Sequence, residues 1–255
     1  MTSVAVDVFA LHGFLGAKDD WQLVSEFLHQ EQPNWKLYPV DLYSDIDLID
    51  LEGSVADLSM DEWAQLFNTW VKKKSTSSSR RILLGYSMGG RLGLHSISKD
   101  FDLWSGAVFL STNPGLLSSD EKLNRLENDK KWADRFLNEE FYQVLSDWNA
   151  QDVFKGSLKL DRKTEVLDKK NLAQALTRWS LGHQKNFRDQ IERWPLRQIW
   201  AAGEKDKKFS QLLATLPATD HIQKWVVEEA SHRLLFEAPQ EVAHFVVRVG
   251  SPIMV

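Results

Sequence analysis

The sequence predicts an α/β fold, with a mostly parallel sheet flanked by helices on both faces. Short apolar, β-branched segments alternate with segments whose apolar residues recur at helical spacing, and this alternation is typical of parallel strands joined by helices. The 255 residues suffice for one large α/β domain. The strand signals stop between about residues 116 and 193. We therefore predict one core with a single helical insertion.

Six segments have the composition of strands. Residues 82–86, Ile-Leu-Leu-Gly-Tyr, are apolar, as expected of a strand inside a parallel sheet. Pro39 lies within the second predicted strand, and because proline has no N–H to donate, one side of that strand should be unpaired, or the proline should lie near its end. In chain order the predicted strands are residues 4–11, 36–42, 82–86, 104–111, 197–203 and 221–228.

Amphipathic segments between these strands predict the helices. In residues 19–30, apolar side chains at Trp21, Val24, Phe27 and Leu28 share one helical face, and an aspartate stands near the start of the segment. The same criterion predicts helices over residues 61–73, 88–98 and 239–249.

Residues 1–115 and 194–255 form the predicted core, and residues 116–193 form the predicted helical cap insertion. Within the insertion, residues 118–138 open with serine and acidic side chains, which are favoured at a helix N-terminus. One predicted strand precedes the His-Gly turn at residues 12–13, so we expect a version of the fold that is trimmed at its N-terminal edge.

Composition and charge narrow the function classes. A formal net charge of −5 argues against a nucleic-acid partner, and no apolar run approaches the roughly 18 residues that a membrane span needs. The sequence has no signal-peptide pattern and no cysteine, so we expect a cytoplasmic protein without disulfides or thiolate metal sites. It shows no metal-binding cluster and no phosphate-binding glycine loop, and we expect no cofactor.

The segment Gly-Tyr-Ser-Met-Gly at residues 85–89 fits the G-x-S-x-G nucleophile elbow. In such an elbow a strand turns sharply into a helix and exposes the serine, and the flanking glycines leave room where the backbone is crowded. Ser87 follows an apolar strand and precedes a predicted helix, as the motif requires. The alternative is an ordinary strand–helix turn with flanking glycines.

A serine hydroxyl needs a base, and the base needs an orienting acid. His232 lies just after the strand 221–228, and Asp206 lies just after the strand 197–203, with Glu204 as the alternative acid. The chain order of serine, acid and histidine is the one found in α/β hydrolases. A lone aspartate on a loop is usually a solvated turn residue, and this order is what singles out Asp206.

An oxyanion hole would complete this machinery, because backbone N–H groups can stabilise developing negative charge. The segment Leu-His-Gly-Phe-Leu-Gly at residues 11–16 follows the first predicted strand. The backbone N–H groups of Phe14 and Met88 are the predicted donors, the second because it opens the helix after Ser87.

With these residues assigned, the chain resembles the α/β-hydrolase superfamily over nearly its full length. Within the superfamily it is most similar to the 2-succinyl-6-hydroxy-2,4-cyclohexadiene-1-carboxylate synthases of menaquinone biosynthesis. The segments that carry the likeness are residues 11–16, 85–95, 113–116, 125–137, 146–154, 203–209 and 230–232. The resemblance implies an α/β-hydrolase fold with a helical cap.

The resemblance also implies a lyase that eliminates pyruvate from a succinyl-enolpyruvyl-hydroxycyclohexene carboxylate without an acyl-enzyme. Ser87, activated by His232 and Asp206, would abstract a ring proton, and the N–H groups of Phe14 and Met88 would hold the resulting charge.

The substrate implied is a small organic anion, and several residues are candidates to bind it. Arg91 stands four residues after Ser87, so both lie on one helix face. A cation in the first turn opposes the helix dipole, and Arg91 should therefore pair with a nearby carboxylate of the protein or grip a substrate carboxylate. By resemblance, Arg125 binds a second carboxylate, and Tyr86 and Trp148 line the pocket. Without the resemblance, Arg125 would be assigned to a solvated helix face, and Tyr86 and Trp148 would be assigned to core packing.

The sequence departs from the family pattern at two places. Residues 41–50 form an acidic run where the family has Asp-Leu-Pro-Gly-His-Gly, and Lys169 or Lys170 stands where the family has a third substrate arginine. We assign Lys169 to substrate binding, although lysine lacks the planar fork of arginine.

The main alternative function is a serine hydrolase, such as a carboxylesterase, a thioesterase or a C–C bond hydrolase, that acts on a small carboxylic substrate through an acyl-Ser87. A non-catalytic binding module is a third hypothesis, which the complete set of triad residues disfavours.

Overall fold

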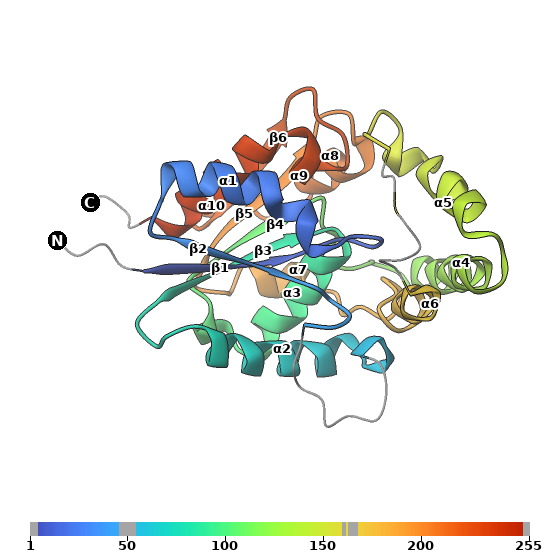
Figure 1. Ribbon diagram of the computed structural model, residues 1–255, viewed down its shortest axis with the longest axis horizontal. Coiled ribbons are helices and arrows are strands. Elements are labelled where there is room, and N and C mark those ends of the chain that lie inside the picture. Colours follow the sequence, from blue (N-terminus) through green and yellow to red (C-terminus); the bar gives the residue numbers. More distant parts are fainter. Residues whose placement is uncertain (1–4, 46–54, 160–161, 163–167, 252–255) are drawn as a thin grey trace.

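A computed structural model describes residues 5–45, 55–159, 162 and 168–251. One sheet of six strands forms the centre of the molecule, and neighbouring strands pair in parallel in the order β2-β1-β3-β4-β5-β6 (Figure 1). The six predicted strands and the predicted fold class are confirmed. The strands are β1 (Val6–Leu11), β2 (Lys36–Val40), β3 (Arg80–Tyr86), β4 (Gly106–Leu110), β5 (Arg197–Gly203) and β6 (Ile222–Val227).

The strand order fixes where a site can form. The chain runs from β1 to β2 at one edge, and then returns to place β3 on the other side of β1. In open parallel sheets, ligands bind beyond the carboxyl ends of the strands at such a reversal. Pro39 pairs with Ala10 of β1, and β2 has no strand on its other side among the described residues. The edge position predicted from the proline is confirmed.

Helices cover both faces of the sheet (Figure 1). On one face α1 (Gln22–Glu31) packs against α10 (Pro239–Gly250), and on the other α2 (Met60–Lys74) packs against α3 (Met88–Lys99). Two hydrophobic clusters fill the space between sheet and helices, and successive residues of β3 alternate between them: Leu83 packs in the α2–α3 cluster and Leu84 in the α1–α10 cluster. This alternation is the ordinary consequence of strand geometry.

Capping boxes fix the starts of two helices. Ser59 accepts a hydrogen bond from the N–H of Glu62 at 3.3 Å, and the Glu62 carboxylate accepts one from the N–H of Ser59 at 2.8 Å. Ser118 and Glu121 form the same reciprocal pair before α4 (Ser119–Asn138). Each box satisfies backbone donors that a helix start leaves free, which explains where α2 and α4 begin.

The described strands all lie outside the predicted insertion, residues 116–193. Its described residues form α4, α5 (Phe141–Asn149), a short 3-10 turn, α6 (Lys169–Arg178) and α7 (Arg188–Ile191). In Figure 1, α4, α5 and α6 lie beyond the carboxyl ends of the strands. A third hydrophobic cluster joins α4, α5 and α6 to Leu15 in the loop after β1. The division into a core and a cap domain stays a prediction, with which this arrangement agrees.

Two further features of the sequence are the lack of a membrane-spanning run and the acidic run at residues 41–50. In the described part of the chain, no helix is both long and apolar enough to cross a membrane. The acidic run at residues 41–50 falls partly outside the described residues. Of its described part, Asp41 and Asp45 hold the loop after β2: the Asp45 carboxylate accepts a hydrogen bond from the Asp41 N–H at 2.9 Å, and the Asp41 carboxylate accepts one from the Tyr43 N–H at 2.8 Å.

Buried His95 and partly exposed Asp61 form a pair on the α2–α3 side whose stability depends on pH. The Nδ1 atom of His95 lies 2.6 Å from Asp61, and burial lowers the pKa of His95 to about 4 although Asp61 opposes the shift. Burial works to raise the pKa of Asp61, but hydrogen bonds from Lys185, Lys99 and His95 outweigh it and hold that pKa well below its usual range. The folded state therefore keeps His95 neutral and Asp61 charged.

This pair predicts a loss of stability in acid. Between pH 6.5 and pH 4 the unfolded chain protonates its histidine and the folded chain does not, so the free energy of unfolding falls as the pH falls. For His95 the loss is about 2 kcal/mol between pH 7 and pH 4.5. Urea unfolding at both pH values should show a smaller loss in His95→Gln than in the wild type. The exposed His244 offers a control, and an equal loss in His95→Gln and His244→Gln would contradict the prediction.

Candidate active site

Ser87 occupies the turn between β3 and α3. Its backbone has φ 50° and ψ −110°, in the strained positive-φ region. The flanking glycines are required by packing: a Cβ on Gly89 would lie 2.3 Å from the carbonyl oxygen of Leu11, and one on Gly85 would lie 2.5 Å from the Cα of Gly90. The glycines at 85 and 89 therefore follow from the close packing of the turn that carries Ser87.

His232 and Asp206 lie in direct contact beside this turn. The Nδ1 atom of His232 donates to the Oδ2 atom of Asp206 at 2.6 Å, and each residue is 3% exposed. Asp206 directly precedes α8 (Lys207–Ala214), and its Oδ1 atom accepts a hydrogen bond from the N–H of Phe209 at 3.3 Å. The alternative acid, Glu204, is exposed and accepts a hydrogen bond from the N–H of Glu229 at 3.2 Å. The structure therefore brings Asp206, and not Glu204, to the histidine.

The histidine is held on several sides. Its carbonyl oxygen accepts a hydrogen bond from the Ser111 hydroxyl at 3.1 Å, and its N–H donates to the Ser157 hydroxyl at 3.2 Å. The rings of Phe209 and Phe154 pack on the imidazole at centroid distances of 4.9 and 5.3 Å. Because Nδ1 is bonded to Asp206, Nε2 is the ring atom available to a hydroxyl group.

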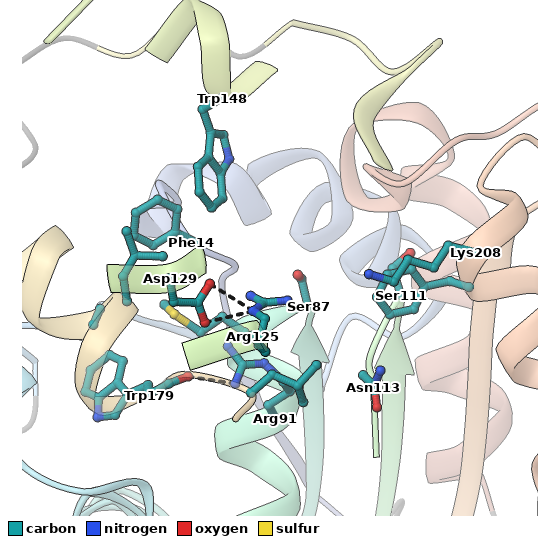
Figure 2. Close-up of a pocket in the computed structure, with 15 residues that line it drawn as sticks. Phe14, Ser87, Arg91, Ser111, Asn113, Arg125, Asp129, Trp148, Trp179 and Lys208 are labelled. Atoms are coloured by element: carbon teal, nitrogen blue, oxygen red, sulfur yellow. Dashed lines mark hydrogen bonds and ion pairs between the residues drawn. The ribbon is translucent and has the colours of Figure 1, made fainter. Parts of the chain in front are cut away.

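Two connected cavities open at Ser87. The inner cavity has a volume of about 80 Å³, and the outer one, which His232 also lines, has about 880 Å³. Figure 2 shows the side chains around this space. The residues that line both cavities are Ser87, Asn113, Arg125, Asp129, Trp148, Leu181, Lys208 and Phe209. Among the described residues, no group of three or more histidine or acidic side chains could hold a metal ion.

The two predicted oxyanion-hole residues lie at the inner cavity. Met88 is the first residue of α3, so its N–H has no acceptor within the helix. Both Met88 and Phe14 line the inner cavity together with Ser87. Their N–H groups therefore stay the predicted donors to negative charge that develops beside the serine.

A buried histidine that sequence reasoning left without a role holds the Phe14 loop. The Nδ1 atom of His12 donates to the carbonyl oxygen of Gly13 at 2.8 Å, and Nε2 accepts a hydrogen bond from the N–H of Leu42 at 3.2 Å. Burial lowers the pKa of His12, so the ring stays neutral and keeps both bonds. The His-Gly pair directly after an apolar strand was the available signal.

Arg91 is 8% exposed and lines the inner cavity. Its Nη1 atom donates to the carbonyl oxygen of Trp179 at 2.7 Å (Figure 2). Burial, and then the like charge of Arg125, lower the pKa of Arg91 to about 9. Within the described part of the chain no carboxylate lies at ion-pair distance from Arg91. The structure therefore does not show the protein ion pair that was the alternative explanation for this arginine.

The side chain of Arg125 extends from α4 to both cavities, and one of its nitrogen atoms is paired with a carboxylate. Its Nε atom lies 2.8 Å from both carboxylate oxygens of Asp129, which is 2% exposed and also accepts a hydrogen bond from the Ser180 hydroxyl at 2.7 Å. Trp148 of α5 lines both cavities and packs on Phe14 at a ring-centroid distance of 4.7 Å. Both residues stand where the resemblance placed them.

Two predicted substrate residues lie elsewhere. Tyr86 is buried in the α1–α10 cluster and touches His232 with ring centroids 5.6 Å apart, but it lines neither cavity. Strand alternation explains this, because residue 86 shares a face with residue 84. Lys169 begins α6, and its Nζ atom donates to the carbonyl oxygen of Glu139 at 3.1 Å, beyond the end of α4. The structure thus places neither residue at the cavity.

A lysine that sequence reasoning overlooked does line both cavities. Lys208 stands two residues after Asp206, in the first turn of α8. The available signal was its closeness in sequence to the catalytic aspartate, since a residue that follows a site loop into a helix can face the same space.

The chain is similar to known proteins over most of its length. Residues 8–245 match a family model described as the alpha/beta hydrolase family. The chain is 34% identical over 225 residues to the 2-succinyl-6-hydroxy-2,4-cyclohexadiene-1-carboxylate synthase of Photorhabdus laumondii, over 83% of this chain and 77% of that protein. It is 30% identical over 241 residues to the synthase of the same name from Klebsiella pneumoniae, over 91% and 88%. Among solved structures, MenH from S. aureus is similar with a TM-score of 0.80 at 20% identity, over 96% of this chain and 92% of that chain, which supports the fold.

Proposed function

Because the chain belongs to the alpha/beta hydrolase family, and within it to the 2-succinyl-6-hydroxy-2,4-cyclohexadiene-1-carboxylate synthases, we propose that its serine site eliminates pyruvate from a succinyl-enolpyruvyl-hydroxycyclohexene carboxylate in menaquinone biosynthesis. The observation that carries this proposal is the joint placement of the Asp206–His232 pair and unpaired cationic groups around Ser87. The absence of cysteine agrees with a cytoplasmic enzyme, which is part of the proposal.

The reaction follows from the two ring structures. The substrate, 2-succinyl-5-enolpyruvyl-6-hydroxy-3-cyclohexene-1-carboxylate, has one ring double bond, and the product is a 2,4-diene. C2 loses a proton, its C–H electrons form the C2–C3 double bond, and the former C3–C4 pair forms C4–C5 as the C5–O bond breaks. The oxygen leaves with the three-carbon unit, which takes a proton to become pyruvate. No water is consumed, so no acyl-enzyme is needed.

Ser87 acts in this reaction as the base. His232 takes the hydroxyl proton at Nε2, the serine oxygen takes the proton from C2, and Asp206 stabilises the imidazolium through Nδ1. C2 stands next to the succinyl carbonyl, so the charge that develops moves onto the carbonyl oxygen. The N–H groups of Phe14 and Met88 hold that oxygen. The same groups that stabilise a tetrahedral intermediate in a hydrolase stabilise an enolate here.

Arg91 and Arg125 bind substrate carboxylates. Both line the inner cavity, and Arg91 keeps donors that the carbonyl of Trp179 does not use. The planar guanidinium suits two-point contact with a carboxylate. The partner of this site is therefore a small organic anion, which these local cations attract although the chain as a whole carries a net charge of −5.

The role of Arg91 predicts a large effect on substrate binding. Arg91→Ala should lower kcat/KM about 100-fold, because a charged hydrogen bond in a buried site is worth about 2–3 kcal/mol, and Arg91→Lys should restore part of the loss. The exposed Arg193 offers a matched control, so Arg193→Ala should keep the wild-type value. An unchanged kcat/KM in Arg91→Ala would show that the substrate does not depend on this residue.

The proposed function is tested by comparing two reactions of the purified protein. The first is pyruvate release from the enzymatically generated cyclohexene substrate, and the second is hydrolysis of a p-nitrophenyl ester. We expect fast pyruvate release and slow or no ester hydrolysis. Ester hydrolysis without pyruvate release would overturn the synthase and leave the serine-hydrolase alternative, in which the same residues form an acyl-Ser87.

A further inference from the structure

Lys208 lies at the candidate active site, although no sequence pattern singles it out. It lines both cavities at Ser87, and Figure 2 shows its amino group directed toward Ser87, with Arg125 and Asp129 across the site. The side chain keeps exposed surface, and the residue forms part of the wall of both cavities. A substrate that fills the cavity would therefore touch the lysine.

Lys208 has no charged partner within the described part of the chain. Among the described residues, no carboxylate lies within ion-pair distance of its Nζ atom and no hydrogen bond of that atom is found; the contact it makes is with the ring of Phe209, whose centroid is 5.9 Å away. The nearby Lys205 differs, because its Nζ atom lies 2.6 Å from the carboxylate of Glu229. A free ammonium group that faces a substrate cavity is available to an anion.

The charges on the wall of the inner cavity do not balance. Arg91, Arg125 and Lys208 face one carboxylate, that of Asp129, which is already engaged by Arg125 and by the hydroxyl of Ser180. Desolvation by the surrounding protein, and then the like charge of Arg125, lower the pKa of Lys208. An anion bound between these cations would relieve their mutual repulsion.

We propose that Lys208 binds a carboxylate of the substrate, as a third cation beside Arg91 and Arg125. This inference rests on the proposed function for the identity of the ligand, which carries three carboxylates: on the ring, on the succinyl chain and on the enolpyruvyl group. The two arginines hold two of them and Lys208 holds the third. The lysine ammonium group is a compact charge with three N–H donors, so it can bind a carboxylate in more than one orientation.

A binding experiment tests the ligand role without turnover. Isothermal titration calorimetry with succinate, a small dicarboxylate, should give a Kd that Lys208→Met weakens about 10-fold or more and that Lys208→Arg largely restores. Lys205→Met is the matched control, since it removes the same charge from the same loop outside the cavity. Equal Kd values for wild type and Lys208→Met, or an equal loss in Lys205→Met, would overturn the proposal.

Steady-state kinetics with the cyclohexene substrate identify the carboxylate. Lys208→Met should raise KM about 10-fold or more with little change in kcat, because a binding contact made equally in the ground and transition states has that signature. Loss of product inhibition by pyruvate alone would assign Lys208 to the enolpyruvyl carboxylate, and loss of inhibition by the diene alone would assign it to the ring or succinyl carboxylate. An unchanged KM would overturn the role. If the wild type releases no pyruvate, the proposed function fails, and the succinate titration still decides on Lys208.

Discussion

Replacement of Ser87 with alanine is expected to lower kcat for pyruvate release about 1,000-fold or more. The hydroxyl oxygen is the base that takes the C2 proton, and alanine leaves nothing in its place on the turn between β3 and α3. The arginines and the backbone N–H groups remain, so KM should change little. Pyruvate formation can be followed with a coupled lactate dehydrogenase reaction.

The controls for this variant separate chemistry from folding. Ser77 lies in an exposed turn before β3, at the opposite end of that strand from Ser87, so Ser77→Ala should keep full activity. Ser87→Ala should keep the wild-type melting temperature, because alanine fits the same backbone. If Ser87→Ala retained more than a tenth of the wild-type kcat, another group would have to be the base and the assignment of Ser87 would be wrong.

Replacement of His232 with alanine is expected to lower kcat by a similar factor of about 1,000. Without the imidazole, the serine hydroxyl has no acceptor for its proton at neutral pH. Asp206→Asn should also be strongly impaired, because an amide donor beside Nδ1 favours the tautomer that carries its proton on Nε2. That tautomer cannot accept the proton of Ser87.

Residues that act as one unit show non-additive effects. The double variant Ser87→Ala/His232→Ala should therefore be about as slow as the slower single variant. If the two losses multiplied, the serine and the histidine would be working independently. That outcome would contradict the proton relay that the contact between His232 and Asp206 supports.

The sequence predicted those parts of the site that depend on strand ends. Ser87 follows β3, Asp206 follows β5 and His232 follows β6, and the carboxyl ends of parallel strands share one edge of the sheet. Chain order and strand position were therefore sufficient to predict which residues meet. The sequence favoured Asp206 and left Glu204 as the alternative, because both follow the same strand. In the structure Asp206 contacts His232, whereas Glu204 accepts a hydrogen bond from the N–H of Glu229.

The substrate-binding residues were harder to predict from sequence. Lys169 and Lys208 both stand in the first turn of a helix, and sequence spacing does not tell which helix start faces the cavity. Lys169 is the first residue of α6, and it donates a hydrogen bond to the carbonyl oxygen of Glu139. In contrast, α8 begins directly after Asp206. Tyr86 was within reach of pattern reasoning, because the alternation along β3 already assigns it to the face opposite Leu83.

Among the helices of the insertion, α4 was easier to recognise in the sequence than α5 and α6. α4 has an unmistakable start in its serine and acidic residues. The starts of α5 and α6 also have caps, since Glu140 accepts a hydrogen bond from the N–H of Gln143 and Asp168 accepts one from that of Lys170, both at 2.8 Å. Each of these caps is a single acidic residue without the reciprocal serine–glutamate pair that precedes α4, so the starts of α5 and α6 are less distinctive in the sequence.

If Ser87 removes a proton and forms no ester, a single-turnover reaction with excess enzyme should leave the protein chemically unchanged. Pyruvate release and the rise of diene absorbance would be followed together, with the intact mass of the protein recorded at each time point. We predict that pyruvate and diene form at the same rate while the mass of the enzyme stays unchanged. A transient mass increase located at Ser87, with no pyruvate formed, would contradict the elimination and show a hydrolase.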